Sequence, residues 1–139
     1  MIVLDTNVLS ELMRASPDAH VLAWIAARPA SALYTTSITQ AEVLHGIELL
    51  PQGRKKRGYQ TAAEGMFAES LRGRVLAFGS AAARAYATIA ATRRRAGRPI
   101  SHFDAQIAAI AHSVMAALAT RNVSDFDDCG IKVISPWQA

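Results

Sequence analysis

Short apolar runs alternate with longer amphipathic stretches along most of the chain. The short runs are typical of strands buried in a sheet, and the longer stretches repeat apolar positions at the i, i+3, i+4 spacing of a helix. The predicted strands are 2–4, 33–36, 74–78, 114–119 and 131–134, and the predicted helices are 8–13, 17–27, 38–50, 55–71, 80–95 and 103–113. Alternating strands and helices pair in parallel through right-handed crossovers. We therefore predict a single α/β domain over residues 1–139, a three-layer α/β/α sandwich with a mostly parallel five-stranded sheet.

Composition narrows the class of protein without naming a function. Half of the 139 residues are hydrophobic, and the single cysteine, Cys129, excludes an internal disulfide. No apolar run approaches the roughly 20 residues that a membrane-spanning helix needs. The first predicted strand begins at Ile2, which leaves no room for a secretory signal segment. We expect a cytoplasmic protein that does not bind a membrane.

Carboxylates follow the predicted junctions between strands and helices. Asp5 follows the first strand, Glu42 lies early in the helix after the second, Asp104 opens the helix at 103, and Asp125 follows the fourth strand. The carboxyl ends of parallel strands share one edge of a sheet, so these acids are expected to converge there. Two carboxylates about 5 Å apart repel by roughly 3 kcal/mol at a dielectric of 20, which exceeds the gain of about 0.3–1 kcal/mol from a helix dipole. The pattern therefore indicates a cation site, and oxygen ligands alone favour Mg²⁺ or Mn²⁺ over Zn²⁺.

Each acid also has a structural explanation. Asp5 is a favoured helix cap, Thr39 with Glu42 matches a capping box, Ser101 with Asp104 has similar spacing, and Asp125 could cap a short turn. A non-catalytic interaction module whose acids only cap helices therefore stays open. So does another metal-dependent phosphoryl hydrolase, such as a phosphatase or receiver domain. Many such phosphatases carry Asp-x-Asp after the first strand, where this chain has Asn7.

Basic residues gather in two clusters, 54–57 and 93–95 with Arg98, within a net charge of +4. Such clusters are either solvated helix ends and loops or contacts for phosphate groups. Together with an acidic metal pocket, they make a nucleic acid the preferred substrate.

Five segments, taken in order, resemble one protein family. They are the opening residues 1–11 (MIVLDTNVLSE), 37–42 (SITQAE), 103–109 (FDAQIAA), 119–122 (ATRN) and 133–137 (VISPW). This set is similar to the PIN-domain ribonucleases, and more narrowly to the VapC-type toxins of prokaryotic toxin–antitoxin pairs, including the FitB-like branch. The resemblance implies a Mg²⁺-dependent endoribonuclease, a co-encoded antitoxin and a tendency to form homodimers.

The resemblance also implies which residues act. Asp5, Glu42 and Asp104 would form the acidic pocket, with the metal held mainly by Asp5 and Asp104 and with Mn²⁺ as a substitute for Mg²⁺. Some relatives carry an acid directly after the Thr-Arg pair, where this chain has Asn122, so either Asp125 or Asn122 would complete the site. Thr6, Asn7, Thr120 and Asn122 would orient ligands or phosphate.

A groove for an antitoxin helix is a further expectation. Apolar residues of the helices beside the predicted pocket could line it, namely Leu9, Leu12, Met13, Leu44, Ile47 and Leu50.

Overall fold

The computed structural model describes residues 1–138, and its centre is a sheet of five strands in which every neighbouring pair is parallel. The strands are β1 Ile2–Leu4, β2 Leu33–Thr36, β3 Val75–Leu76, β4 Ala117–Ala119 and β5 Val133–Ile134, in the order β3-β2-β1-β4-β5. The register places Leu4, the last residue of the central strand, opposite Ala119. The carboxyl ends of these strands therefore meet at one edge, as the sequence predicted.

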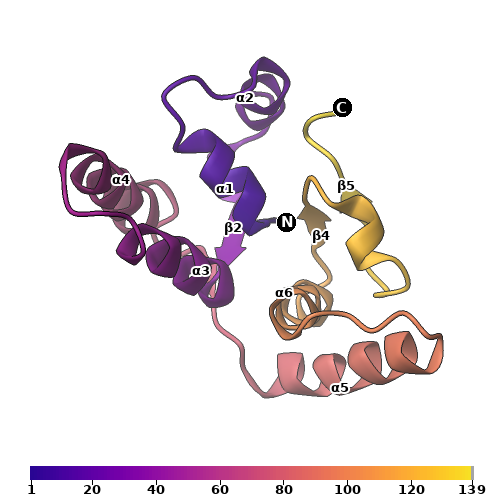
Figure 1. Ribbon diagram of the computed structural model, residues 1–139. Helices are drawn as coiled ribbons and strands as arrows, with labels where there is room; N and C mark the ends of the chain where they lie inside the picture. The colour runs from indigo at the N-terminus through magenta and orange to yellow at the C-terminus, as the bar shows by residue number, and fades with distance from the viewer. Residues whose placement is uncertain (139) are drawn as a thin grey trace.

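Within residues 1–138, six α-helices lie around the sheet (Figure 1). They are α1 Thr6–Leu12, α2 Ala19–Ala26, α3 Ser37–Glu48, α4 Arg54–Gly65, α5 Ser80–Arg95 and α6 His102–Ser113. Among the described residues, none of these helices is long and apolar enough to cross a membrane.

Two neighbouring residues of β1 show how the layers form. Side chains alternate between the faces of a strand, so Val3 and Leu4 point to opposite sides of the sheet. Val3 packs into a core with residues of α5 and α6, whereas Leu4 packs with residues of α1 and α2. The sheet is therefore covered on both faces, and the predicted three-layer α/β/α sandwich is confirmed.

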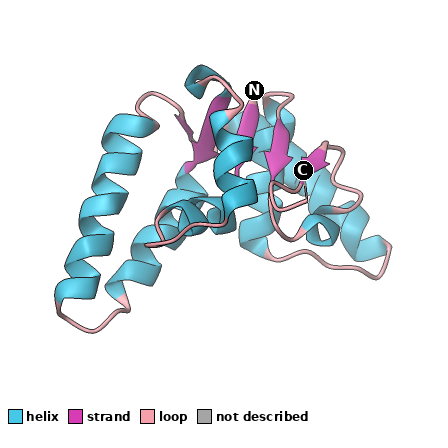
Figure 2. Ribbon diagram, turned by 90° about the horizontal axis from the view of Figure 1, so that it is seen from above, coloured by secondary structure: helices cyan, strands magenta, loops and turns pink. Residues whose placement is uncertain are grey.

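Helices α3 and α4 form an antiparallel pair that extends beside the sheet (Figure 2). Val43 and Ile47 of α3 pack against Ala63 of α4, with Tyr59 and Met13 at the border of this small core. The pair stands next to the carboxyl edge of the sheet and supplies one wall of the cavity described below.

Alanine allows α6 to lie close to both the sheet and α5. Its residues 107–111 (IAAIA) are all buried, with exposed fractions of 1% or less. Small side chains let backbones approach closely at this position, so the alanines of α6 serve its packing.

The strands predicted over 74–78 and 131–134 are shorter in the structure, Val75–Leu76 and Val133–Ile134. Two further predicted elements differ because of local backbone geometry. The helix predicted over 55–71 ends at Gly65 and continues as a π-helical turn, Met66–Ser70. The strand predicted from 114 begins only at Ala117, since Val114 ends α6 and Met115 takes a left-handed conformation with φ 54°. The apolar run alone does not show where a helix stops and a strand starts.

Two predicted helix starts also differ. The cap of α3 is Thr36, whose hydroxyl accepts a hydrogen bond from the Thr39 amide, so the Thr39–Glu42 capping box is wrong. Helix α2 begins after Asp18, which caps the His20 amide, and not at Pro17. Glu42 is thereby released from a capping role.

Candidate active site

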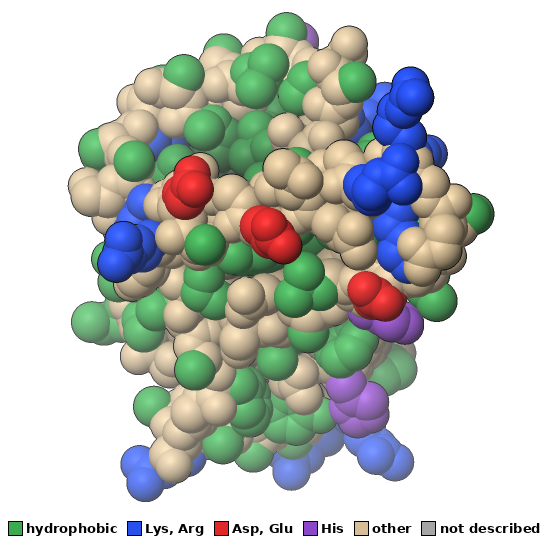
Figure 3. All heavy atoms as spheres, turned by 90° about the vertical axis from the view of Figure 1, so that its left-hand side faces the viewer, with side chains coloured by type: hydrophobic (Ala, Val, Ile, Leu, Met, Phe, Trp, Pro, Cys, Tyr) green, Lys and Arg blue, Asp and Glu red, His purple; other side chains and the backbone are tan. Residues whose placement is uncertain are grey.

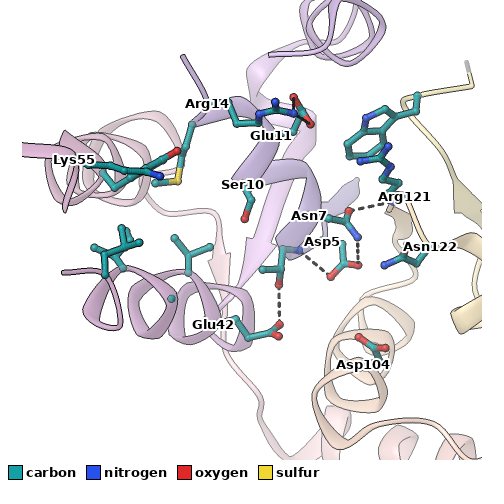
Figure 4. A pocket seen from close by; sticks show the side chains of 18 residues that line it. Asp5, Asn7, Ser10, Glu11, Arg14, Glu42, Lys55, Asp104, Arg121 and Asn122 are labelled. Atoms are coloured by element: carbon teal, nitrogen blue, oxygen red, sulfur yellow. Dashed lines mark hydrogen bonds and ion pairs between the residues drawn. The ribbon is translucent and has the colours of Figure 1, made fainter. Parts of the chain in front are cut away.

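A cavity of about 740 Å³ opens at the carboxyl edge of the sheet. Its walls come from α1, α3, α4, the start of α6 and the segment after β4 (Figure 4). Four carboxylates line it, from Asp5, Glu11, Glu42 and Asp104. The sequence predicted that three of these would meet, and the fold brings them into one cavity.

Asp5 is the buried acid of this site, with 5% of its surface exposed. It caps α1, because its Oδ1 accepts the Thr6 amide at 2.8 Å. Its other oxygen, Oδ2, accepts the Thr120 hydroxyl at 2.7 Å and the Asn7 side-chain amide at 3.4 Å. The helix cap and the site carboxylate are therefore the same group, and the two predicted roles of Asp5 do not compete.

Burial raises the pKa of Asp5 from 3.8 to about 6. The hydrogen bonds from Thr120 and Thr6 lower this pKa, and the charges of Asp104 and Glu42 raise it. The pKa of Asp104 is also raised, chiefly by burial and further by the charge of Asp125. Both raised pKa values mean that the charged form of the carboxylate is disfavoured at this site, and a bound cation would stabilise that form.

The Thr120 hydroxyl is the centre of a polar network beneath Asp5. Its oxygen accepts the Asn7 side-chain amide and the Asn122 backbone amide, each at 3.2 Å. With two donors on its oxygen, the hydroxyl hydrogen is directed to Asp5. Asn7 in turn accepts the Arg121 backbone amide at 3.0 Å. The network ties the start of α1 to the end of β4, so it fixes the direction of the Asp5 carboxylate.

Glu42 enters the cavity from α3 and is oriented by α1. The Thr6 hydroxyl donates to Glu42 Oε1 at 2.7 Å and lies 3.2 Å from the hydroxyl of buried Thr39. Thr6 therefore binds two acids at once, one through its amide and one through its hydroxyl. Asp104 comes from the first turn of α6, which Ser101 caps by accepting the Asp104 amide.

The two candidates for the fourth position are separated by the structure. Asn122 lines the cavity, whereas Asp125 does not. Asp125 lies exposed on the short 3₁₀ turn Val123–Phe126, and only its effect on the pKa of Asp104 connects it with the site.

The donor set fits a hard divalent cation bound by few protein ligands. None of Asp5, Glu42 and Asp104 forms an ion pair with a basic side chain within residues 1–138. In the same part of the chain, no three His, Cys, Asp or Glu side chains stand close enough to enclose a metal ion. Mg²⁺ is commonly held by one or two carboxylates, with water and substrate phosphate completing its shell. The site therefore resembles an open magnesium site and lacks the closed ligand cage of structural zinc.

Several residues of the cavity had no predicted role. Glu11 is buried, accepts the Asp18 amide at 3.0 Å and pairs with Arg14 at 3.3 Å. Trp137 and Tyr59 supply aromatic surface at two sides of the cavity. Nothing in the sequence pattern separates Glu11 from an ordinary polar helix position, because its partner at Asp18 depends on the turn between α1 and α2.

The two basic clusters contain structural cations. Lys56 is buried and donates to the Glu48 carbonyl at 3.0 Å, which ties α4 to α3. Arg93 is also buried and donates to the carbonyls of Asp125 and Asp127. For these two side chains neither alternative holds, since they are neither solvated nor free to contact phosphate. Of cluster 54–57, Lys55 lines the cavity.

Comparison with known proteins places this geometry in a family. Residues 2–131 match the PIN domain. The chain is 44% identical to the VapC ribonuclease Y4jK of Sinorhizobium fredii, over 99% of both proteins, and 35% identical to the toxin FitB of Neisseria gonorrhoeae, again over 99% of both. The solved structure of FitAB bound to an IR36 DNA fragment superposes with a TM-score of 0.92 at 35% identity, covering 99% of this chain and 96% of that one. By sequence and by fold, the chain belongs to the PIN-domain family.

Proposed function

We propose that this protein is a Mg²⁺-dependent endoribonuclease and the cytoplasmic toxin of a type II toxin–antitoxin system. The observation that carries the proposal is the convergence of Asp5, Glu42 and Asp104 in one cavity, where none of them has a basic ion-pair partner among residues 1–138. The names of the relatives, a VapC ribonuclease and the FitB toxin, support the same activity.

The residues of the cavity divide the chemistry among them. Asp5, held by Thr120 and the Thr6 amide, and Asp104, from α6, would hold the ion. When bound, a divalent cation supplies a more acidic water and offsets negative charge at the phosphorus. Glu42, oriented by the Thr6 hydroxyl, accepts a proton as general base. Attack by water leaves a 5′-phosphate and a 3′-hydroxyl.

Asn122, and not Asp125, would complete this site, because it lies in the cavity and is joined to Thr120. Asp125 acts on Asp104 only through its charge. Asn122→Ala should then lower activity more than Asp125→Asn does.

The cavity continues into an apolar groove that suits a protein partner. Met13, Val43, Ile47, Leu50 and Tyr59 line this part of the cavity, next to the acids. Of the residues expected to line a groove, Leu9 and Leu12 instead pack in the core, and Leu44 is exposed. An amphipathic helix of an antitoxin would place its apolar side chains here and cover the acids. Solved structures of FitAB and VapBC complexes support an antitoxin partner.

Homodimer formation stays a prediction. On the side formed by α3 and α4, hydrophobic side chains are spread over the face, and basic groups lie toward its edges (Figure 3). Leu44 and Leu49 are 44% and 72% exposed there. Analytical ultracentrifugation of the purified protein measures the oligomer directly.

The test of the proposed function is incubation with single-stranded RNA in Mg²⁺, in Mn²⁺ and in EDTA. The parent protein should cleave RNA with either ion and not in EDTA. The variants Asp5→Asn and Asp104→Asn should not cleave under any of these conditions. The products should carry 5′-phosphate ends. Products with 2′,3′-cyclic phosphate ends, or equal cleavage in EDTA, would exclude the mechanism. Co-expression with the antitoxin should give a stable complex with suppressed cleavage, and separate elution at micromolar concentration would contradict that partner.

A further inference from the structure

Arg121 lines the cavity with a backbone held by hydrogen bonds and a side chain that forms no ion pair within residues 1–138. Its amide donates to Asn7 Oδ1 at 3.0 Å, and the next amide, of Asn122, donates to Thr120. The backbone of Arg121 is therefore locked to the same network that orients Asp5. Its side chain is exposed and has no ion pair or hydrogen bond within residues 1–138.

An aromatic ring supports the guanidinium of Arg121. Its central carbon lies 5.2 Å from the centroid of the Trp137 ring, within the range of a cation–π contact. Trp137 itself is half-buried and packs against the core that contains Leu4 and Val8. Stacking uses one face of the guanidinium and leaves its edge donors free for two oxygens of a phosphate.

Several other arginines already bind carboxylates or backbone carbonyl oxygens. Arg14 pairs with Glu11, Arg98 with Asp127 and Asp128, and Arg93 with backbone carbonyls. Of the basic side chains that line the cavity, only Lys55 and Arg121 form no ion pair with a carboxylate among the described residues. Figure 4 shows these two cations on opposite sides of the cavity, with Asp5 and Glu42 between them.

This arrangement has a consequence for the substrate. Two uncompensated cations on either side of a carboxylate centre suit a chain with regularly spaced negative charges more than a single phosphate group. We propose that Arg121, supported by Trp137, binds a phosphate adjacent to the scissile one, and that Lys55 binds the RNA backbone on the other side. The inference rests on the proposed ribonuclease function and assigns the path of the strand across the site, between α4 and the C-terminal segment. Arg121 is then a substrate-binding residue that holds the strand in place over the acids.

The experiment compares Arg121→Gln and Arg121→Lys with the parent protein. Losing a charged hydrogen bond to phosphate should raise the KM for a short single-stranded RNA by about 10- to 100-fold. The log–log salt slope of RNA binding should fall by about 0.7, the value for one lost phosphate contact on a single strand. Binding is measured by fluorescence anisotropy in the Asp104→Asn background, so this readout does not depend on cleavage. Arg121→Lys should recover the salt slope but only part of the affinity, because an ammonium group cannot bind two oxygens side by side.

Controls separate substrate binding from structural damage. Arg72→Gln removes the same charge from an exposed position outside the cavity and outside both basic clusters, and should leave KM and the salt slope unchanged. The rise in melting temperature that Mg²⁺ causes should be the same in Arg121→Gln as in the parent. Trp137→Leu should weaken RNA binding less than Arg121→Gln does.

Two results would overturn the inference. One is an unchanged KM and salt slope in Arg121→Gln while the parent cleaves RNA. The other is loss of the Mg²⁺ response in that variant, which would mean that Arg121 acts through the network beneath Asp5. If the parent itself cleaves no RNA with metal present, the proposed function has failed, and the binding data still report separately on Arg121.

Discussion

The buried charge of Asp5 should make the metal-free protein less stable as the pH rises. The folded pKa of about 6 lies above the value of 3.8 for an unperturbed aspartate, so the folded state holds this proton more tightly than the unfolded state does. Stability from this group is therefore greatest below pH 3.8 and is lost as the pH rises through 6. The difference between a pKa of 3.8 and one of about 6 corresponds to about 3 kcal/mol in the free energy of unfolding. Between pH 4.5 and pH 7 the loss is about 2 kcal/mol, from the difference in bound protons between the two states.

Asp5→Asn removes this titration and should remove the associated pH dependence. The assay is urea unfolding of parent and variant in EDTA at both pH values. With a slope of about 2 kcal/mol per molar urea, the parent midpoint should fall by about 1 M more than that of the variant. At pH 7 the metal-free variant should be no less stable than the parent, although asparagine cannot keep every hydrogen bond that Asp5 accepts.

A matched control isolates the effect. Glu64→Gln removes an exposed carboxylate of α4 outside the cavity and should retain the pH dependence of the parent. Acids that do not interact with Asp5 contribute equally to parent and variant and cancel in the comparison, whereas Asp104 and Glu42 are coupled to Asp5 and are relieved of its charge in the variant. Parallel pH dependence in the parent and Asp5→Asn would refute the reasoning, because it would show that folding does not raise the pKa of Asp5.

Three further outcomes follow from the same contacts. Saturating Mg²⁺ should raise the melting temperature of the parent through binding to the folded state alone, and should do so much less for Asp104→Asn; equal responses in thermal melts would place the metal elsewhere. Thr120→Val removes the hydroxyl that donates to the buried Asp5 carboxylate and should cost about 1–3 kcal/mol of stability in urea unfolding, while Thr120→Ser should stay close to the parent; a neutral valine variant would contradict the network. Lys55→Gln should lower the salt slope of RNA binding by about 0.7, whereas Lys56→Gln should lower stability and leave that slope unchanged; the reverse result would exchange their roles.

The helices and strands and their order could be predicted because, along most of the chain, the spacing of apolar residues matches the side chains that the fold buries. Apolar runs identified the strands, and the acid after the first strand needed only the parallel arrangement to be placed at the shared edge. The ends of elements were less predictable. The π-helical turn after Gly65 and the left-handed Met115 depend on tertiary packing that no local pattern records.

The same distinction applies to the site. Asp5, Glu42 and Asp104 could be placed in one cavity from topology, because Asp5 directly follows a strand and the other two lie in the first halves of helices. The choice between Asn122 and Asp125 could not, since only two residues separate them and the directions of their side chains depend on a 3₁₀ turn. Charge clusters were the weakest guide. Lys56 and Arg93 look identical to their exposed neighbours in sequence and differ only in which carbonyls the fold brings to them.

The burial of α6 determines how such an enzyme can be switched off. Residues 107–111 of this helix are enclosed between the sheet and α5, so we expect their amides to exchange with deuterium only when the whole domain unfolds. Asp104 stands on the first turn of the same helix, shortly before this enclosed segment. We therefore do not expect local melting of the enclosed segment to provide an inactive state. An inhibitor has to cover the open cavity instead, and activity should return intact whenever that cover is removed.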